Sequence, residues 1–175
     1  MLGRFIWFFA IVIMVSCQDK TISVVSSKQN SKDQLLDLNR KFAKAEAKFI
    51  ATMIDSLAIP AIEDSLGYWY LIYSKGSQQP IYAHYKDRVK VRYSLCLLEG
   101  DTIYGSSNMV EKSFVVGRTE IESGLHHAVK HLSVGDKAKI ILPSHLAFGT
   151  YGDGAKVPAK ASLLYDLELI KIYSK

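Results

Sequence analysis

Two different periodicities divide the chain into a helical part and a β-rich part. From Asp33 to Leu57 apolar side chains recur every three or four residues, which predicts an amphipathic helix that ends before Pro60. Its apolar positions are Leu35, Leu38, Phe42, Ala45, Phe49 and Met53. This stripe either packs on the domain that follows or pairs with a second copy of the chain through the helix 33–57, and packing on the domain is the favoured alternative.

After Gly67 the pattern becomes that of strands. Residues 68–73 form an aromatic and branched run, and residues 89–97 alternate strictly between apolar and polar side chains, as in a strand with one buried face. Further strands are predicted at 102–104, 114–116, 137–142 and 163–172, and one helix at 120–132. We therefore expect an α+β fold in which an antiparallel sheet of about five strands curves around one short helix, preceded by the amphipathic N-terminal helix.

The first residues differ from the rest of the chain. Arg4 is followed by an uncharged, mostly apolar stretch from Phe5 to Ser16. As a helix this stretch would span about 18 Å, well short of the roughly 30 Å of hydrocarbon in a bilayer, so it predicts a signal segment rather than a permanent membrane span. Residues 17–32 are rich in Ser, Lys, Gln and Thr and predict a flexible tether.

The end of the apolar stretch resembles the lipobox of bacterial lipoproteins. Val15, Ser16 and Cys17 fit that motif, and Met14 stands where it usually has leucine. The resemblance implies a signal peptide over residues 1–16 and lipidation of Cys17. Such a protein would be tethered to a membrane by its lipid, in the cell envelope of a Gram-negative bacterium, on the periplasmic face or at the outer membrane. An ordinary secretory signal with an incidental cysteine is the alternative.

Composition, charge and cysteine content exclude several classes of protein. The chain of 175 residues is 49% hydrophobic and 22% charged, which excludes pervasive disorder, and its net charge of +5 comes without a basic run, which argues against a nucleic-acid partner. Two cysteines, Cys17 and Cys96, allow neither a disulfide framework nor a cysteine-built zinc site. His127 and His131 lie four residues apart and could face one metal ion, but without a nearby acidic or thiol ligand we favour a solvated polar face and no metal.

A series of short motifs between Tyr68 and Ile172 occurs in the order found in one enzyme family. The motifs are Val89–Tyr93, Ser106-Ser107, Phe114 with Gly117, Glu122–Leu125, Leu132–Ala138, Leu146–Gly149, Val157-Pro158 and Leu163–Leu169. Together they resemble an FKBP-type peptidyl-prolyl cis-trans isomerase. The resemblance places that domain at 68–173, with its core at 86–173, after a helix and connection at 33–66. With its leader, the chain is similar to FKBP lipoproteins of Bacteroidetes, including the gliding-motility-associated subgroup.

The resemblance also implies a site. Tyr93, Ile121, Phe148 and Tyr165 would form the catalytic cup around a substrate proline, and the backbone N–H of Glu122 would donate to a substrate carbonyl. The remaining substrate-binding side chains would be Tyr104, Phe114 and Leu125. The family's chemistry implies no cofactor, and its substrates would be proline-containing polypeptides, here exported proteins at the envelope.

Three departures from the family's pattern change this expectation. Leu125 stands where many members have tryptophan, which deepens the cup, and Phe148 replaces a common tyrosine. The family's Phe-Asp pair matches either Ile103-Tyr104 or Tyr104-Gly105, and neither alignment supplies the aspartate. We therefore expect a proline-binding pocket that lacks one polar group. An FKBP-fold chaperone or adaptor with weak or no isomerase activity remains the alternative to an isomerase.

Overall fold

The computed structural model describes residues 21–105 and 108–173, which fall into two compact units with the boundary between Asn39 and Arg40. The predicted signal peptide 1–16, the lipidation site Cys17 and the Ser106-Ser107 motif lie outside the described residues. Within the described ranges, no helix is both long enough and apolar enough to cross a membrane.

Helix α1 (Thr21–Ser56) is longer than the sequence pattern indicates. It begins at Thr21 rather than near Asp33, so residues 21–32, expected as part of a flexible tether, are helical. Once a helix is nucleated, each further residue adds a hydrogen bond at little cost, and Gln, Lys and Ser do not stop it. The predicted end is confirmed, because α1 stops at Ser56, four residues before Pro60.

The C-terminal half of α1 packs through a different face from the one predicted. Ile50 and Ile54 are buried, together with the carboxylate residue Glu46 one turn earlier. They form a small core with Trp69, Leu98 and Ile141. The predicted stripe is instead exposed, with Leu38, Phe42 and Phe49 showing 61%, 37% and 42% of their surface. Packing on the domain is therefore confirmed for the helix, while Phe42 and Phe49 of the stripe stay partly exposed and line a cavity with the loop before β7.

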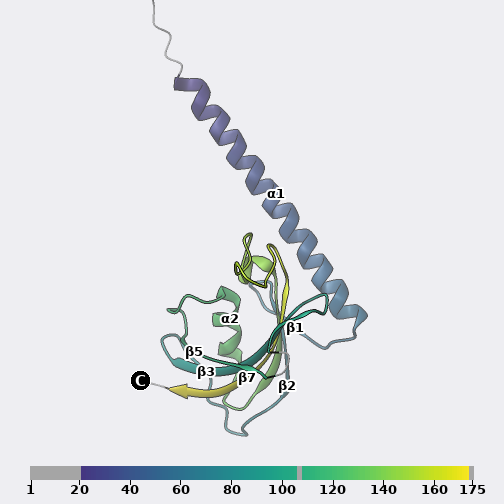
Figure 1. The fold of residues 1–175 in the computed structure, drawn as a ribbon, viewed down its shortest axis with the longest axis vertical. Helices are drawn as coiled ribbons and strands as arrows, with labels where there is room; N and C mark the ends of the chain where they lie inside the picture. The colour runs from purple at the N-terminus through teal and green to yellow at the C-terminus, as the bar shows by residue number, and fades with distance from the viewer. Residues whose placement is uncertain (1–20, 106–107, 174–175) are drawn as a thin grey trace, which may run out of the picture. The chain divides into compact units, whose positions relative to one another are not determined.

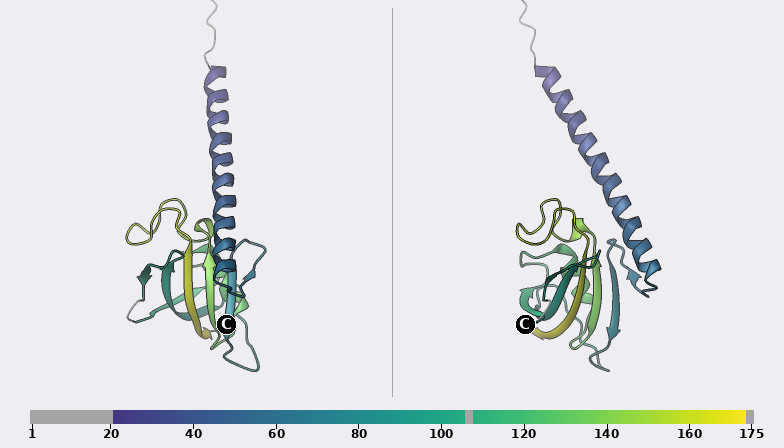
Figure 2. Two further views of the ribbon diagram at one scale, coloured as in Figure 1. Left: turned by 90° about the vertical axis from the view of Figure 1, so that its right-hand side faces the viewer. Right: turned by 45° about the vertical axis from the view of Figure 1, so that its right-hand side comes forward.

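Within the described residues, the second unit also contains an antiparallel sheet of seven strands, two more than expected because it includes very short ones. The strands (Figure 1) are β1 (Ile62–Glu63), β2 (Trp69–Ser74), β3 (Arg88–Leu97), β4 (Thr102–Tyr104), β5 (Val110–Val115), β6 (Lys137–Leu142) and β7 (Leu163–Tyr173). Their order is β1-β2-β6-β7-β3-β4, with β5 also paired to β3. The last strand in sequence thus runs through the middle of the sheet, beside β6 (Figure 2).

The sheet curves around helix α2 (Ser123–Ala128), which continues as the 3₁₀ turn η1 (Val129–His131) (Figure 1). The alternation predicted for β3 is confirmed, since Val89, Val91 and Leu95 are buried on the helix side. The helix is shorter than the expected 120–132, because Glu122 has extended backbone angles and forms its N-cap. A second 3₁₀ turn, η2 (Ser144–Leu146), opens the long loop between β6 and β7. The α+β prediction is confirmed.

Candidate functional site

The side chains predicted to line the cup all belong to one hydrophobic cluster. Phe114 from β5, Leu125 from α2 and Tyr165 from β7 are buried in it, with 2%, 1% and 1% of their surface exposed. The partly buried members packed against them include Tyr93, Tyr104, Ile121 and Phe148. Four strands, one helix and the loop before β7 therefore bring the predicted site residues into one apolar cluster on the helix side of the sheet.

Aromatic rings make up much of its wall. The rings of Tyr93 and Tyr165 lie 5.4 Å apart at an angle of 53°, a tilted contact between adjacent strands. Phe114 meets the ring of His126 edge-on at 5.6 Å. Burial, followed by the charge of Glu122, raises the pKa of the Tyr93 hydroxyl. The wall thus presents neutral aromatic faces at ordinary pH.

Glu122 places a carboxylate inside this apolar site. The residue is 7% exposed, and the hydroxyl of Tyr165 donates a hydrogen bond to its Oε1 over 2.7 Å. Its Oε2 is buried and has no hydrogen-bond partner among the described residues. Burial and the adjoining carboxylate together raise the pKa of Tyr165, which keeps that hydroxyl as a donor. The sequence resemblance assigned only the backbone N–H of Glu122, and missed its side chain.

A second carboxylate stands at the rim. The hydroxyl of Tyr104 donates to Oδ2 of Asp153 over 2.5 Å, from β4 to the loop before β7. Oδ1 of Asp153 accepts the N–H groups of Ala155, Lys156 and Val157, which fixes the local turn. The aspartate that the family's pattern places beside Tyr104 is absent, and Asp153 bonds to Tyr104 from the loop instead. Two carboxylates reach the tyrosines from other parts of the chain.

The histidines of α2 and η1 have structural partners rather than a solvated face. Nδ1 of His126 accepts the N–H of Gly117 at 3.0 Å, and its Nε2 donates to the Thr119 carbonyl at 2.9 Å. Nε2 of His131 lies 3.0 Å from the Tyr68 hydroxyl and 3.3 Å from Oδ2 of Asp64. Among residues 21–105 and 108–173, no three His, Cys, Asp or Glu side chains are grouped as metal ligands would be.

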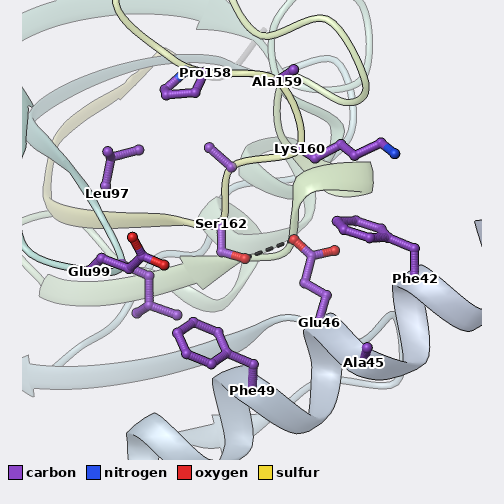
Figure 3. A pocket seen from close by; sticks show the side chains of 12 residues that line it. Phe42, Ala45, Glu46, Phe49, Leu97, Glu99, Pro158, Ala159, Lys160 and Ser162 are labelled. Carbon is purple, nitrogen blue, oxygen red and sulfur yellow. Dashed lines mark hydrogen bonds between the residues drawn. The ribbon is translucent and has the colours of Figure 1, made fainter.

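A separate cavity of about 420 Å³ lies away from this cup, between the C-terminal half of α1 and the loop before β7. Phe42 and Phe49 point into it from the helix, and Pro158 and Lys160 face them from the loop (Figure 3). At its floor Glu46 accepts hydrogen bonds from the Ser162 hydroxyl at 2.7 Å and from the Ser144 N–H at 2.7 Å. This contact attaches the helix to the domain.

The curved antiparallel sheet around a short helix brings the predicted site residues, which are tyrosines, phenylalanines and aliphatic side chains, together in one cluster. Comparison with known families matches residues 79–170 to the FKBP-type peptidyl-prolyl cis-trans isomerase domain. That range covers more than half of the chain. The chain belongs to the FKBP-type peptidyl-prolyl cis-trans isomerase family.

Individual relatives agree with this assignment. The chain is 36% identical over 90 residues to the peptidyl-prolyl cis-trans isomerase FPR2 of Saccharomyces cerevisiae, covering 50% of this chain and 67% of that protein. It is 34% identical over 87 residues to FK506-binding protein 2 of Dictyostelium discoideum, covering 49% of this chain and 65% of that protein.

One solved structure extends the likeness to more of the fold. The peptidyl-prolyl cis-trans isomerase from Pseudomonas syringae pv. tomato str. DC3000 superposes with a TM-score of 0.63 at 25% identity. The match covers 77% of this chain and 96% of that one. The family resemblance seen in the sequence is therefore confirmed, while the lipoprotein form and the Bacteroidetes subgroup stay predictions.

Proposed function

We propose that this protein isomerises Xaa-Pro bonds of exported polypeptides at the cell envelope. The observation that carries the proposal is the presence of Tyr93, Phe148 and Tyr165 in one hydrophobic cluster within a domain of the FKBP-type family. Only bonds that precede proline have cis and trans forms close enough in energy for both to be populated. A site shaped for the proline ring therefore selects the one peptide bond for which isomerisation matters.

The proposed catalysis follows from desolvation. Rotation about a peptide bond has a barrier of roughly 18–20 kcal/mol, which arises from amide resonance. Water stabilises the charge-separated planar amide, so a dry aromatic wall lowers the energy needed to twist the bond. Leu125, which stands where many family members have tryptophan, would deepen the floor for the ring without adding a polar group, as the family resemblance implies. The N–H of Glu122, at the start of α2, would hold the substrate carbonyl, as the family resemblance implies.

A protease-free isomerisation assay on a proline peptide tests this function. We expect Phe148→Ala and the double variant Phe148→Ala/Tyr165→Ala to lower kcat/KM by at least about tenfold, since each opens the cup to water. Tyr151→Ala is the matched control, because Tyr151 lies in the same loop with 91% of its surface exposed. Equal rates for wild type and both cup variants would reject the isomerase. Phe148 is partly exposed, so Phe148→Ala tests the cup even where the double variant unfolds.

The alternative, a chaperone or adaptor that holds extended segments, is favoured by the exposed apolar side chains around the 420 Å³ cavity. Phe42 and Phe49 offer client-binding surface that no cup variant would remove. This function predicts suppression of client aggregation that survives Phe148→Ala but falls in Phe42→Ser/Phe49→Ser. Aggregation that is unaffected by the wild-type protein would exclude it.

The envelope location is proposed through Cys17. The Met14–Cys17 motif supports lipidation there, and acyl chains on that residue would hold the domain at the periplasmic face or the outer membrane of a Gram-negative cell. Expression of the full chain with an alkyne-labelled fatty acid should label the wild type and leave Cys17→Ser unlabelled and released from membranes. Equal labelling of both would reject lipidation at this position.

Pairing of two copies through the helix 33–57 is proposed from its exposed stripe. Leu35, Leu38 and Phe42 show 59%, 61% and 37% of their surface and follow one another at three- and four-residue spacing. Such a stripe can form the seam of a two-helix contact. Sedimentation of the wild type as a dimer, and of Leu38→Lys as a monomer, is the expected result, whereas a wild-type monomer would reject it.

A further inference from the structure

Glu122 stands apart from the other cup residues because it places a carboxyl group with one unpartnered oxygen among apolar and aromatic side chains. Oε1 is bonded to the Tyr165 hydroxyl, and Oε2 has no partner among the described residues. Within those residues no Lys, Arg or His forms an ion pair with this carboxylate. A buried acceptor without a donor carries an uncompensated desolvation cost, which a suitable ligand could relieve.

The position of the carboxylate relates it to the substrate rather than to the fold alone. Glu122 is the N-cap residue of α2, three residues before Leu125 at the floor of the cup. It bonds to Tyr165, and its charge raises the pKa of both Tyr93 and Tyr165 after the effect of burial. The carboxylate therefore lies at the junction of the residues that would enclose the proline.

We infer that Glu122 sets substrate specificity, and that its carboxylate selects prolines flanked by a lysine or an arginine. This inference rests on the isomerase function proposed above. A cation next to the bound proline supplies the donor that Oε2 lacks and balances its charge, whereas an acidic neighbour meets repulsion in a site of low dielectric. Apart from Tyr104 and its bond to Asp153 at the rim, the other predicted cup side chains are apolar or aromatic and distinguish little between charges.

Peptides that differ only beside the proline test this specificity. Lysine, norleucine and glutamate are placed in turn immediately before and immediately after the proline, so that norleucine keeps the length of lysine without its charge. At one of the two positions the wild type should favour lysine over norleucine by about tenfold in kcat/KM, and norleucine over glutamate by a similar factor.

Glu122→Gln is the informative variant, because its amide oxygen still accepts the Tyr165 hydroxyl while its NH₂ replaces the charged acceptor with a donor. The lysine preference should fall to about onefold and the glutamate peptide should improve relative to norleucine. Glu120→Gln is the matched control: it removes the same charge two residues away, on an exposed side chain, and should keep the wild-type ratios.

Tyr165→Phe separates specificity from simple support of the fold. If Glu122 only held Tyr165 in place, Glu122→Gln would keep that hydrogen bond and leave turnover of all three peptides unchanged, while Tyr165→Phe would lower turnover of all three equally. That pattern overturns the inference. So does a lysine-to-norleucine ratio that is unchanged in Glu122→Gln at both positions. Affinities of the same peptides, measured by fluorescence anisotropy, give the ratios independently of turnover, so an inactive wild type rejects the isomerase while the affinity ratios still decide the specificity.

Discussion

The hydroxyl of Tyr104 and the carboxylate of Asp153 are joined by a hydrogen bond of 2.5 Å, between the end of β4 and the loop before β7. Both residues are partly buried at the rim of the cup. The bond ties the loop that carries Phe148 to the strand opposite it, while the other oxygen of Asp153 holds three backbone N–H groups of the loop. One side chain thus sets both the conformation of the loop and its attachment.

This contact predicts a pH dependence. The hydrogen bond from Tyr104 is the main reason that the pKa of Asp153 falls to about 2 from its ordinary 3.8. A depressed pKa in the folded state means that the ionised carboxylate stabilises the fold above the unfolded value, and that this contribution is lost as the pH falls through about 2. The urea midpoint of wild type should exceed that of Asp153→Asn at pH 5, and the difference should shrink toward pH 2. A difference that is constant with pH would contradict the assignment.

Removal of Glu46 should loosen α1 from the domain. Its carboxylate accepts the Ser144 N–H, the Ser144 hydroxyl and the Ser162 hydroxyl, all within 2.9 Å. Because Glu46→Ala leaves these groups without their acceptor in a buried place, we expect the free energy of unfolding to fall by about 2–4 kcal/mol. Urea unfolding measures the change. Lys44→Ala, at an exposed position on the same helix, should change it by less than about 0.5 kcal/mol.

Gly124 allows α2 to approach the sheet. A Cβ at this position would lie 2.6 Å from Cδ2 of Leu142 and 3.0 Å from the Leu146 carbonyl oxygen. Alanine forms helices better than glycine by about 1 kcal/mol, but overpacking costs about 1–3 kcal/mol. The overpacking cost should therefore outweigh the gain in helix propensity and lower the free energy of unfolding. We expect Gly124→Ala to lower the melting temperature and, by displacing Glu122 and Leu125, the isomerase rate. A raised melting temperature with full activity would contradict this and show that a methyl group fits at position 124 without overpacking.

The end of α1 offers a stabilising substitution. Ala58 has φ of 49°, and the N–H of Ile59 donates to the Ile54 carbonyl at 3.1 Å, as in a helix terminated by a left-handed residue. Glycine adopts this conformation without the steric cost that alanine meets, so Ala58→Gly should raise the free energy of unfolding by about 0.5–1 kcal/mol.

Gly67→Ala is the control for which the change in the free energy of unfolding should have the opposite sign. Gly67 has φ of 84°, and no heavy atom lies within 4 Å of the place that a Cβ would take, so alanine there would meet backbone strain alone. It should lower the free energy of unfolding by about 1 kcal/mol. Changes of the same sign at both positions would contradict the conformational explanation.

The strands were predictable because their burial follows from local alternation. Val89, Val91 and Leu95 lie on one face of β3 and are buried, as a period of two requires. The face of α1 was not predictable in the same way. Leu38 and Phe42 made the stronger local stripe, whereas the domain presents the serine donors that bind Glu46 and an apolar surface that fits Ile50 and Ile54. Tertiary contacts with the domain therefore determine which face of α1 is buried, and the local sequence pattern does not encode those contacts.

The same distinction holds at the site. The order of motifs predicted side chains that the structure brings into one hydrophobic cluster, since the family resemblance carries their topology. It could not predict that Tyr165 would pair with Glu122, or Tyr104 with Asp153, because these partners are 43 and 49 residues apart. A buried glutamate two residues after an exposed one, at the start of a helix with an apolar inner face, was the only local signal of a charge directed inward.

The central place of β7 has a consequence for biosynthesis. This strand lies between β6 and β3 and supplies Tyr165, yet it is the last in sequence of the strands in the described residues. Until residues 163–173 have left the ribosome, β3 and β6 lack the strand that joins them, and their unpaired edges and apolar faces stay open. An emerging chain therefore cannot complete the sheet, or bring Tyr165 to Tyr93, before residues 163–173 are available.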